Sequence, residues 1–487
     1  MANRGEIALR VMRTCRELGI GTATVYSDID RAAPHVRAAD EAYPIGKAPP
    51  RESYLNIERI IAVAKRAGCD AIHPGYGFLS ENADFADAVA AGGMAFVGPP
   101  AAVQRTLGEK TSARRLAANA GVPVAEGTMQ PLTDEADARA TAERIGYPVL
   151  LKPAGGGGGK GMRVVRSTAE LSSAWRASTG EATTAFGAPA LLMERLIQPA
   201  RHVEVQLLAD TQGTVVWLGE RDCSIQRRHQ KLVEESPGPS VDAALRAKLG
   251  AAAVTVASAA KYVNAGTAEF LVAPDGSFVF LEMNTRLQVE HPVTELVTGL
   301  DLVALQLRIA AGDRLPFGQD GIHPTGAAIE LRITAEDPFA AFLPHGGQVD
   351  FVREPAGPGI RMDSGLAAPL TVPTDYDPLL AKLIAWGPDR AAAIARARRA
   401  VREMIVAGLP TSLPFHSFVL AERDFAAGRY DTDYVATHWS RPAAAEITEG
   451  AAIAAALAGI ARLRSRPRPI PADASPWSRS AREDLLR

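Results

Sequence analysis

Polar and apolar residues alternate over residues 282–290, and the polar ones are of types that carry chemistry. They are Glu282, Asn284, Arg286, Gln288 and Glu290. Because residues i and i+2 of a β-strand lie on the same face, a strand here would hold two acids, two amides and a guanidinium in one row. A guanidinium suits a small planar anion, and a neighbouring carboxylate can act as a general base. The row is typical either of a solvated edge strand or of an active-site wall.

A second acid is expected directly across from the start of this row. The Asp275-Gly276 dipeptide between two apolar runs predicts a two-residue hairpin turn, which places Glu269 opposite Glu282. Like charges directly across a strand pair are destabilising, so a divalent cation between them is expected. Mg²⁺ held by carboxylate oxygens and nucleotide phosphates fits this chemistry, with Asn284 supplying a further oxygen. Two solvated acids on an exposed face are the alternative.

Five consecutive glycines at 155–159 follow a predicted strand that ends near Lys152. They do not form a P-loop, because Ala154 replaces its first glycine and Gly161 stands where Ser or Thr is required. A glycine-rich lid whose backbone N–H groups surround phosphate oxygens is one interpretation, and a flexible hairpin tip is the other. The flanking Lys152 and Lys160 favour the lid.

Several further polar residues have a structural explanation when each is taken alone. They are Gln226, His229 and Lys231 on a basic segment, the isolated His202 and Cys223, and the i, i+2 pair Glu330 and Arg332. The basic segment is more typical of a salt-bridged surface strand than of a site. A lone histidine or cysteine is most often a structural residue, and an ion pair explains the last two.

Elements of two kinds must position these residues. Helical and strand patterns alternate over the first hundred residues, which predicts a doubly wound parallel sheet. After residue 197 antiparallel strand patterns dominate, interrupted by a helix near 243–262 and by a single helix expected from Thr294 onward. A long helix is expected at 390–405. The fold class is therefore α/β, with α+β character in the later part.

Composition limits the class of protein. A chain of 487 residues is long enough for roughly two to four domains. The net charge of -2 argues against a general nucleic-acid binder. Three dispersed cysteines fit a reducing, cytoplasmic setting better than a disulfide framework or a zinc site. No apolar run approaches the ~18 residues of a membrane span, and charges in every turn of the first residues exclude a signal peptide.

Seven motifs in order resemble biotin carboxylase, the ATP-grasp component of biotin-dependent carboxylases. They are ANRGEIALR, HPGYGFLSEN, KPAGGGGGKGMRVV, RHVEVQ, ERDCSIQRRHQKLVEE, EMNTRLQVEHPVTE and RITAEDP, and the resemblance covers about residues 2–440. It implies an ATP-grasp fold. The implied parts are an N-terminal doubly wound domain (1–100), a helical connection (101–123), a glycine-rich lid (124–196), a catalytic core (197–323), a C-terminal mixed-sheet domain (324–441) and a tail without an assigned role (442–487).

The resemblance also implies an activity. Such enzymes use ATP with Mg²⁺ or Mn²⁺ to convert bicarbonate to carboxyphosphate, which releases CO₂ for the carboxylation of biotin. No Met is followed by Lys in this chain, so the family's biotin-attachment motif is absent and biotin is expected on a separate carrier protein. The expected partners are this biotin carboxyl carrier protein and a carboxyltransferase subunit, in a homodimer or a larger complex, with no nucleic acid and no membrane. Another ATP-grasp ligase, of carboxylate–amine or carbamoyl-phosphate type, and a non-catalytic relative are the alternatives.

The resemblance assigns roles to residues by their place in the motifs. The implied ATP-binding residues are Lys110, Lys152, Gly157, Gly158, Glu194, Ile197, His202, Gln226, His229, Glu269 and Glu282. The implied metal ligands are Glu269, Glu282 and Asn284, and the implied bicarbonate site is Lys231, Arg286, Gln288 and the backbone of Val289. Glu290 matches the base that deprotonates bicarbonate, and Arg332 matches the biotin-binding group that stabilises the biotin enolate. Lys231, Arg286, Glu290 and Arg332 form the expected catalytic set.

The chain departs from the family pattern at its start. Family members open with a strand before ANRGE that is central to the first sheet, and here Met1 stands in its place. A missing central strand would expose sheet edges. We therefore expect that the natural chain begins upstream; a longer chain that melts at the same temperature would contradict this.

Overall fold

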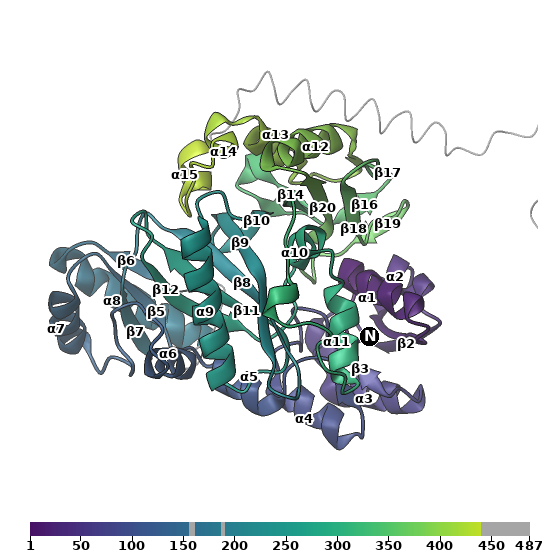
Figure 1. Cartoon of the computed structure of the whole chain (residues 1–487), viewed down its shortest axis with the longest axis horizontal. Helices are drawn as coiled ribbons and strands as arrows, with labels where there is room; N and C mark the ends of the chain where they lie inside the picture. Colours follow the sequence, from purple (N-terminus) through teal and green to yellow (C-terminus); the bar gives the residue numbers. More distant parts are fainter. Residues whose placement is uncertain (155–160, 187–189, 440–487) are drawn as a thin grey trace, which may run out of the picture.

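The computed structural model describes residues 1–154, 161–186 and 190–439 (Figure 1). The predicted phosphate-binding residues Gly157 and Gly158 and the tail at 442–487 lie outside the described residues. Within those ranges, no helix combines the length and the apolar character that crossing a bilayer requires.

Short helices and parallel strand pairs make up the N-terminal part. The elements are α1 (Gly5–Glu17), β1 (Ala23–Ser27), α2 (Pro34–Ala38), β2 (Glu41–Gly46), α3 (Ile57–Arg66), β3 (Ala71–Ile72), α4 (Ala83–Ala91) and β4 (Ala95–Phe96). Parallel pairing is confirmed for β1 with β2 and for β3 with β4, but these are two separate ladders. The first residues of the chain lie between them, because the Met1 ammonium donates to Ala23 O (2.6 Å) and Ala2 N donates to His73 O (3.0 Å).

A small unit with its own apolar core follows two connecting helices. The connection is α5 (Ala101–Gly108) and α6 (Lys110–Asn119); the unit contains α7 (Glu135–Ile145), β5 (Val149–Pro153), β6 (Arg163–Val165), α8 (Thr168–Phe186) and β7 (Leu191–Arg195). Its antiparallel sheet has the order β6-β5-β7. Alternate residues Val149 and Leu151 of β5 are buried in this core with Leu171 of α8. This unit, at the left of Figure 1, carries Lys152 and Glu194.

The largest element is an eight-stranded antiparallel sheet of order β12-β11-β8-β9-β10-β13-β20-β18. Its strands are β8 (Arg201–Ala209), β9 (Val215–Arg227), β10 (Gln230–Ser236), β11 (Asn264–Val272), β12 (Phe278–Asn284), β13 (Ala327–Thr334), β18 (Ile360–Ser364) and β20 (Leu379–Gly387). Because β10 pairs with β13, this sheet runs across the boundary expected at 324. The domain limits from the sequence stay predictions.

Helices and short strand pairs surround this sheet. The helices are α9 (Ala243–Ala259), α10 (His291–Thr298), α11 (Leu302–Ala310), α12 (Arg390–Glu403), α13 (Leu413–Ala421), α14 (Arg423–Ala426) and α15 (Tyr434–His438). The pairs are β14 (Glu336–Asp337) with β15 (Leu343–Pro344), β16 (Gly347–Val349) with β19 (Leu370–Val372), and β17 (Phe351–Arg353) with β21 (Ile405–Ala407). In Figure 1, α9 lies across the strands around β8 and β9, while α12 and α13 cover the far end.

Strand alternation separates the apolar core from the polar site. In β8, Val203 and Val205 are buried in one apolar cluster with Leu249 and Val256 of α9. Their alternation partners, such as Glu204, therefore project to the opposite face of the sheet. The same alternation in β11 sends Glu269 to that polar face, because Ala268 and Phe270 belong to the α9 cluster.

The hairpin between β11 and β12 confirms one prediction and corrects another. Glu269 pairs with Glu282, as expected. The predicted two-residue turn is wrong: Ala273 N donates to Ser277 O (2.8 Å), which leaves a three-residue loop in which Gly276 adopts φ 80°. This loop shifts the register by one residue, and an irregularity between Glu269 and Phe270 shifts it back. Two offsetting shifts restore the predicted pair.

Two further expectations about elements are wrong. The strand expected through Glu290 ends at Asn284, and residues 285–290 form a loop that leads into α10. The single helix expected from Thr294 is two helices, because Gly299 ends α10 in the left-handed conformation at φ 73° and Asp301 caps α11. The break turns the chain, so α10 can pack on β13 while α11 packs on β11.

Candidate active site

A lysine whose side chain is only 10% exposed lies at the centre of the polar face of the sheet. The Lys231 ammonium donates to Glu204 (2.5 Å), Glu269 (2.8 Å) and Glu290 (2.7 Å). These acids come from β8, from β11 and from the end of the loop before α10. Burial opposes the charge on Lys231, but the three carboxylates outweigh it and raise its pKa well above the ordinary value. The isolated surface-strand interpretation of this lysine is therefore wrong.

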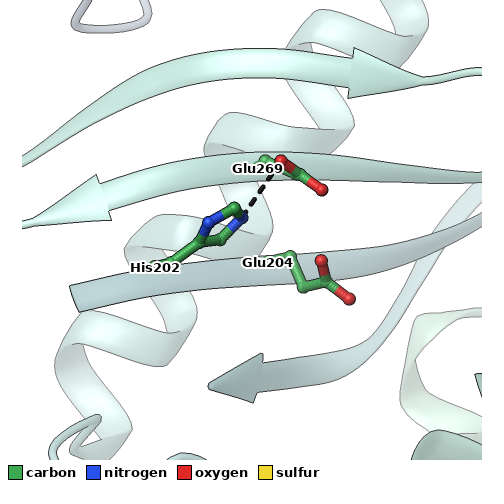
Figure 2. Close-up of side chains that lie close together, drawn as sticks. All are labelled: His202, Glu204 and Glu269. Carbon is green, nitrogen blue, oxygen red and sulfur yellow. Dashed lines mark ion pairs between the residues drawn. The ribbon is translucent and has the colours of Figure 1, made fainter. Parts of the chain in front are cut away.

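The acids around Lys231 form, with one histidine and one cysteine, two groups whose ligand atoms lie close enough together to hold a metal ion. These groups are His202, Glu204 and Glu269, and Glu204, Cys223 and Glu290. Figure 2 shows His202 and Glu204 on one strand and Glu269 on its neighbour. Since the ammonium already bonds the acids of both groups, we assign neither group a metal ion.

The carboxylate of Glu290 is fully buried and held between two cations. Lys231 donates to one of its oxygens, and Arg332 Nη2 donates to the other at 2.8 Å. Burial alone would raise its pKa, but Lys231 and Arg332, with Arg221 behind them, hold it well below the ordinary value. Glu290 is therefore ionised and carries no proton of its own. On its other side, Arg332 Nε donates to Glu234 at 2.5 Å.

The guanidinium of Arg286 is fixed by three side-chain oxygens from different residues. It donates to Gln288 Oε1 (2.8 Å), Asn284 Oδ1 (3.0 Å) and Glu81 Oε2 (2.9 Å). The predicted bicarbonate residues therefore lie together although they do not share a strand. Glu81 also accepts the N–H of Thr285 at 2.9 Å, which ties the loop to the N-terminal part.

The facing acids Glu269 and Glu282 each have a basic partner. His202 Nε2 lies 3.0 Å from Glu269, and Lys110 Nζ lies 3.5 Å from Glu282. The pKa of Glu269 is below its ordinary value because Lys231 and His202 outweigh the opposite effect of burial. Cationic side chains thus offset part of the repulsion that the sequence attributed to a metal alone.

The oxygens of this pair still fit a divalent cation. Two carboxylates and the amide oxygen of Asn284 form a donor set of the kind that Mg²⁺ prefers, although a cation would replace the contact of Arg286 with Asn284 and a basic partner of Glu269. The Glu282 side chain is 34% exposed, so one of these carboxylates is open to a ligand. The pair adjoins the Lys231 cluster, which consists of Lys231, Glu204, Glu269 and Glu290, because Glu269 belongs to both.

The predicted nucleotide residues of the small unit form a second cluster. Glu194 of β7 makes ion pairs with Lys152 of β5 and with Arg114 of α6. Burial lowers the pKa of Lys152 despite its carboxylate partner. An ammonium that is stripped of water and close to one acid is well suited to bind a phosphate oxygen.

Three further residues that the resemblance assigns to the nucleotide lie near these clusters. Ile197 lies in the segment between β7 and β8. Gln226 is buried in β9 directly across from Lys231. His229 is exposed in the two-residue turn between β9 and β10, with φ 66°.

Sequence reasoning missed several residues that hold the site. Glu204 stands two residues after His202, so strand alternation alone would have placed it on the polar face. Glu81 lies in one of the quoted motifs but received no role. Arg221, which donates to Glu204 at 2.5 Å, and Glu234 lie in another quoted motif and likewise received no role.

The eight-stranded sheet carries paired acids and lies beside the small unit with its buried basic groups. This is the ATP-grasp arrangement, and it identifies the class of the protein as an ATP-dependent ligase. Comparisons with known families then narrow the class. The family model "Biotin carboxylase, N-terminal domain" matches residues 1–103, and "Biotin carboxylase C-terminal domain" matches residues 330–437. Between them, "Carbamoyl-phosphate synthase L chain, ATP binding domain" matches residues 109–317.

Individual proteins and structures agree with these matches. The chain is 50% identical over 435 residues to the biotin carboxylase of Nostoc sp., covering 89% of this chain and 97% of that protein. It is 49% identical over 436 residues to the biotin carboxylase of Haemophilus influenzae, again covering 89% of this chain and 97% of that protein. The biotin carboxylase domain dimer of Hydrogenobacter thermophilus 2-oxoglutarate carboxylase, solved with MgADP, ADP and bicarbonate, superimposes with a TM-score of 0.87 at 44% identity over 90% of this chain and 96% of that one.

The chain belongs to the biotin carboxylase family. The resemblance inferred from the motifs, the ATP-grasp fold and the ATP-dependent carboxylation of biotin are confirmed. The alternative of another ATP-grasp ligase is not favoured.

Proposed function

We propose that the Lys231 cluster is the place where bicarbonate is activated for the carboxylation of biotin. The observation that carries this proposal is the buried, ionised Glu290 held between Lys231 and Arg332. Bicarbonate binds to Lys231, to the fixed guanidinium of Arg286, to Gln288 and to the backbone of Val289. An anion in this position lies beside a carboxylate that is ready to accept its proton.

The proposed reaction begins with proton transfer from bicarbonate to Glu290. The bicarbonate oxygen then forms a bond to the γ-phosphorus of ATP as the bond to ADP breaks, and the product is carboxyphosphate. Its breakdown gives CO₂ and phosphate, and phosphate takes the ring N–H proton of biotin. Arg332 stabilises the negative charge that this proton transfer leaves on the ureido oxygen, and the biotin nitrogen then attacks CO₂.

The nucleotide is proposed to lie between the small unit and the sheet. Lys110 and Lys152 bind its phosphates, and Lys152 exchanges its contact with Glu194 for a phosphate oxygen. The other expected contacts to the nucleotide are Gly157, Gly158, Glu194, Ile197, His202, Gln226 and His229. Glu269, Glu282 and Asn284 hold Mg²⁺ or Mn²⁺, which would neutralise phosphate charge when bound.

The proposed partners are those that the related carboxylase subunits imply. Biotin is proposed to arrive on a separate carrier protein, and a carboxyltransferase subunit is proposed to pass the carboxyl group to an acyl or keto acceptor. A dimer is proposed because the related Hydrogenobacter thermophilus domain is described as one. A cytoplasmic location agrees with free thiols at Cys15, Cys69 and Cys223.

ADP release by the purified protein tests this function. With ATP, Mg²⁺ and bicarbonate, free biotin is expected to increase the rate of ADP release. If a folded, nucleotide-binding sample shows no stimulation by biotin, the proposal is wrong. Ammonia in place of biotin is the control for the other ligase classes, and it is expected to have no effect.

A further inference from the structure

The loop at residues 285–290 depends on contacts from outside itself. It lies between β12 and α10 and has no strand partner within the described part of the chain. Side chains from outside the loop hold its backbone at three points: Thr285 N by Glu81 (2.9 Å), Gln288 O by His291 Nδ1 (2.7 Å) and Val289 O by Lys382 Nζ (2.8 Å). The third point is at the peptide bond that leads into Glu290.

Lys382 is an unusual residue for the middle of a buried strand. It lies on β20, is fully buried, and has acids from two other elements as partners. Its ammonium lies 3.3 Å from Glu6 of α1 and 3.8 Å from Asp363 of β18. Burying an ammonium costs several kcal/mol, and well-packed apolar residues are often as stable or more stable in such places. Stability alone therefore does not explain this lysine.

The position of Lys382 in the sheet connects it to the site. It is directly opposite Arg332 in the pairing of β13 with β20, so the two side chains project from the same face. Arg332 fixes the carboxylate of Glu290, and Lys382 fixes the carbonyl just before Glu290. Arg332 and Lys382, which are neighbours in the sheet, thus hold the side chain of Glu290 and the peptide group before it.

We propose that Lys382 is a positioning residue for bicarbonate activation, acting through the carbonyl of Val289. Because the peptide group is planar, a bond to Val289 O also orients the N–H of Glu290. The bond thereby restrains the backbone on both sides of the plane, which sets where the N–H of Val289 and the carboxylate of Glu290 point. Lys382 does not itself contact the reactants. This inference rests on the proposed function of the Lys231 cluster.

The test is a comparison of Lys382→Met with Glu6→Gln. The first variant removes the donor to Val289 O, whereas the second removes one acidic partner of the same ammonium and leaves that donor in place. Displacements of ~1 Å near reacting groups can cost about 10²-fold in rate. We expect Lys382→Met to raise the KM for bicarbonate or lower kcat about tenfold or more, with the KM for ATP unchanged within about twofold. Glu6→Gln is expected to change the melting temperature but not the KM for bicarbonate.

A second comparison covers the case in which Lys382→Met does not fold. The double variant Glu6→Gln/Lys382→Met removes the acid that methionine would leave without a cation, and it is compared with Glu6→Gln alone. The bicarbonate defect is expected in the double variant only. The positioning role would be overturned if Lys382→Met, or the double variant where Lys382→Met does not fold, had the same bicarbonate kinetics as Glu6→Gln. It would also be overturned if the kinetic defects only followed the loss of stability. A wild-type protein without biotin-stimulated ADP release would instead refute the proposed function itself.

Discussion

Replacing Glu330 with glutamine should make the protein less sensitive to rising pH. Glu330 and Glu234 are fully buried and face each other across β13 and β10. Arg332 donates to Glu234, while neither carboxylate oxygen of Glu330 has a hydrogen-bond partner among the described residues. Two carboxylates in such a place do not both ionise. Burial raises the pKa of Glu330 well above its ordinary value despite the nearby Lys382, and burial raises that of Glu234 to about 7.

The size of the effect follows from counting protons. Above pH 4.5, the ordinary pKa of this group, the unfolded chain loses a proton that the folded protein keeps on Glu330. The folded state then binds one more proton, so its stability falls as pH rises, by about 1.4 kcal/mol per pH unit. Between pH 5.5 and 7.5 the loss is on the order of 3 kcal/mol. Glutamine is neutral throughout, so the stability of the Glu330→Gln variant relative to wild type should increase by this amount.

Thermal unfolding at pH 5.5, 6.5 and 7.5 measures this change. The difference in Tm between variant and wild type should widen by several degrees toward pH 7.5, since 1 kcal/mol corresponds to about 2–4 °C for a unit of 150–250 residues. Glu403→Gln on α12, where the side chain is 41% exposed, is the matched control and should show no widening. A Tm difference that is the same at all three pH values would mean that Glu330 is ionised in the folded protein, and the reasoning would be wrong.

Two further predictions concern the site. Lys231 and Arg332 outweigh burial and hold the pKa of Glu290 well below its ordinary value. Protonation of Glu290 should therefore not lower kcat/KM for bicarbonate between pH 7 and 5.5. A fall in this range that moves to higher pH in the Lys231→Met variant would contradict the assignment. Glu81→Gln should raise the KM for bicarbonate several-fold and leave ATP binding unchanged, because it weakens a partly exposed ion pair of about 1 kcal/mol with Arg286. An equal effect on both substrates in steady-state assays would show that Glu81 supports the whole site.

The sequence predicted chemistry better than it predicted local shape. The pairing of Glu269 with Glu282 was right although the turn was wrong, because a register irregularity near Glu269 has no signal in the residue pattern. Alternation suggested a strand through Glu290, yet the strand ends at Asn284. The polar residues beyond it still meet at one site because contacts from distant segments hold the loop.

Long-range contacts explain what sequence reasoning could not reach. Glu81 is 204 residues away from Thr285, and Lys382 is 93 residues away from Val289. Neither contact leaves a local pattern. Lys231 likewise bonds acids from three separate segments, two of them strands of the sheet and the third the loop at 285–290.

The most direct test of the central claim compares Arg286→Ala and Glu290→Gln with wild type. Biotin-dependent ADP release and the Kd for ATP are measured on the same folded samples. If residues 286–290 activate bicarbonate, both variants should lose biotin-dependent turnover and bind ATP nearly as wild type does. Loss of ATP affinity in both variants would place these residues in the nucleotide site and contradict the claim.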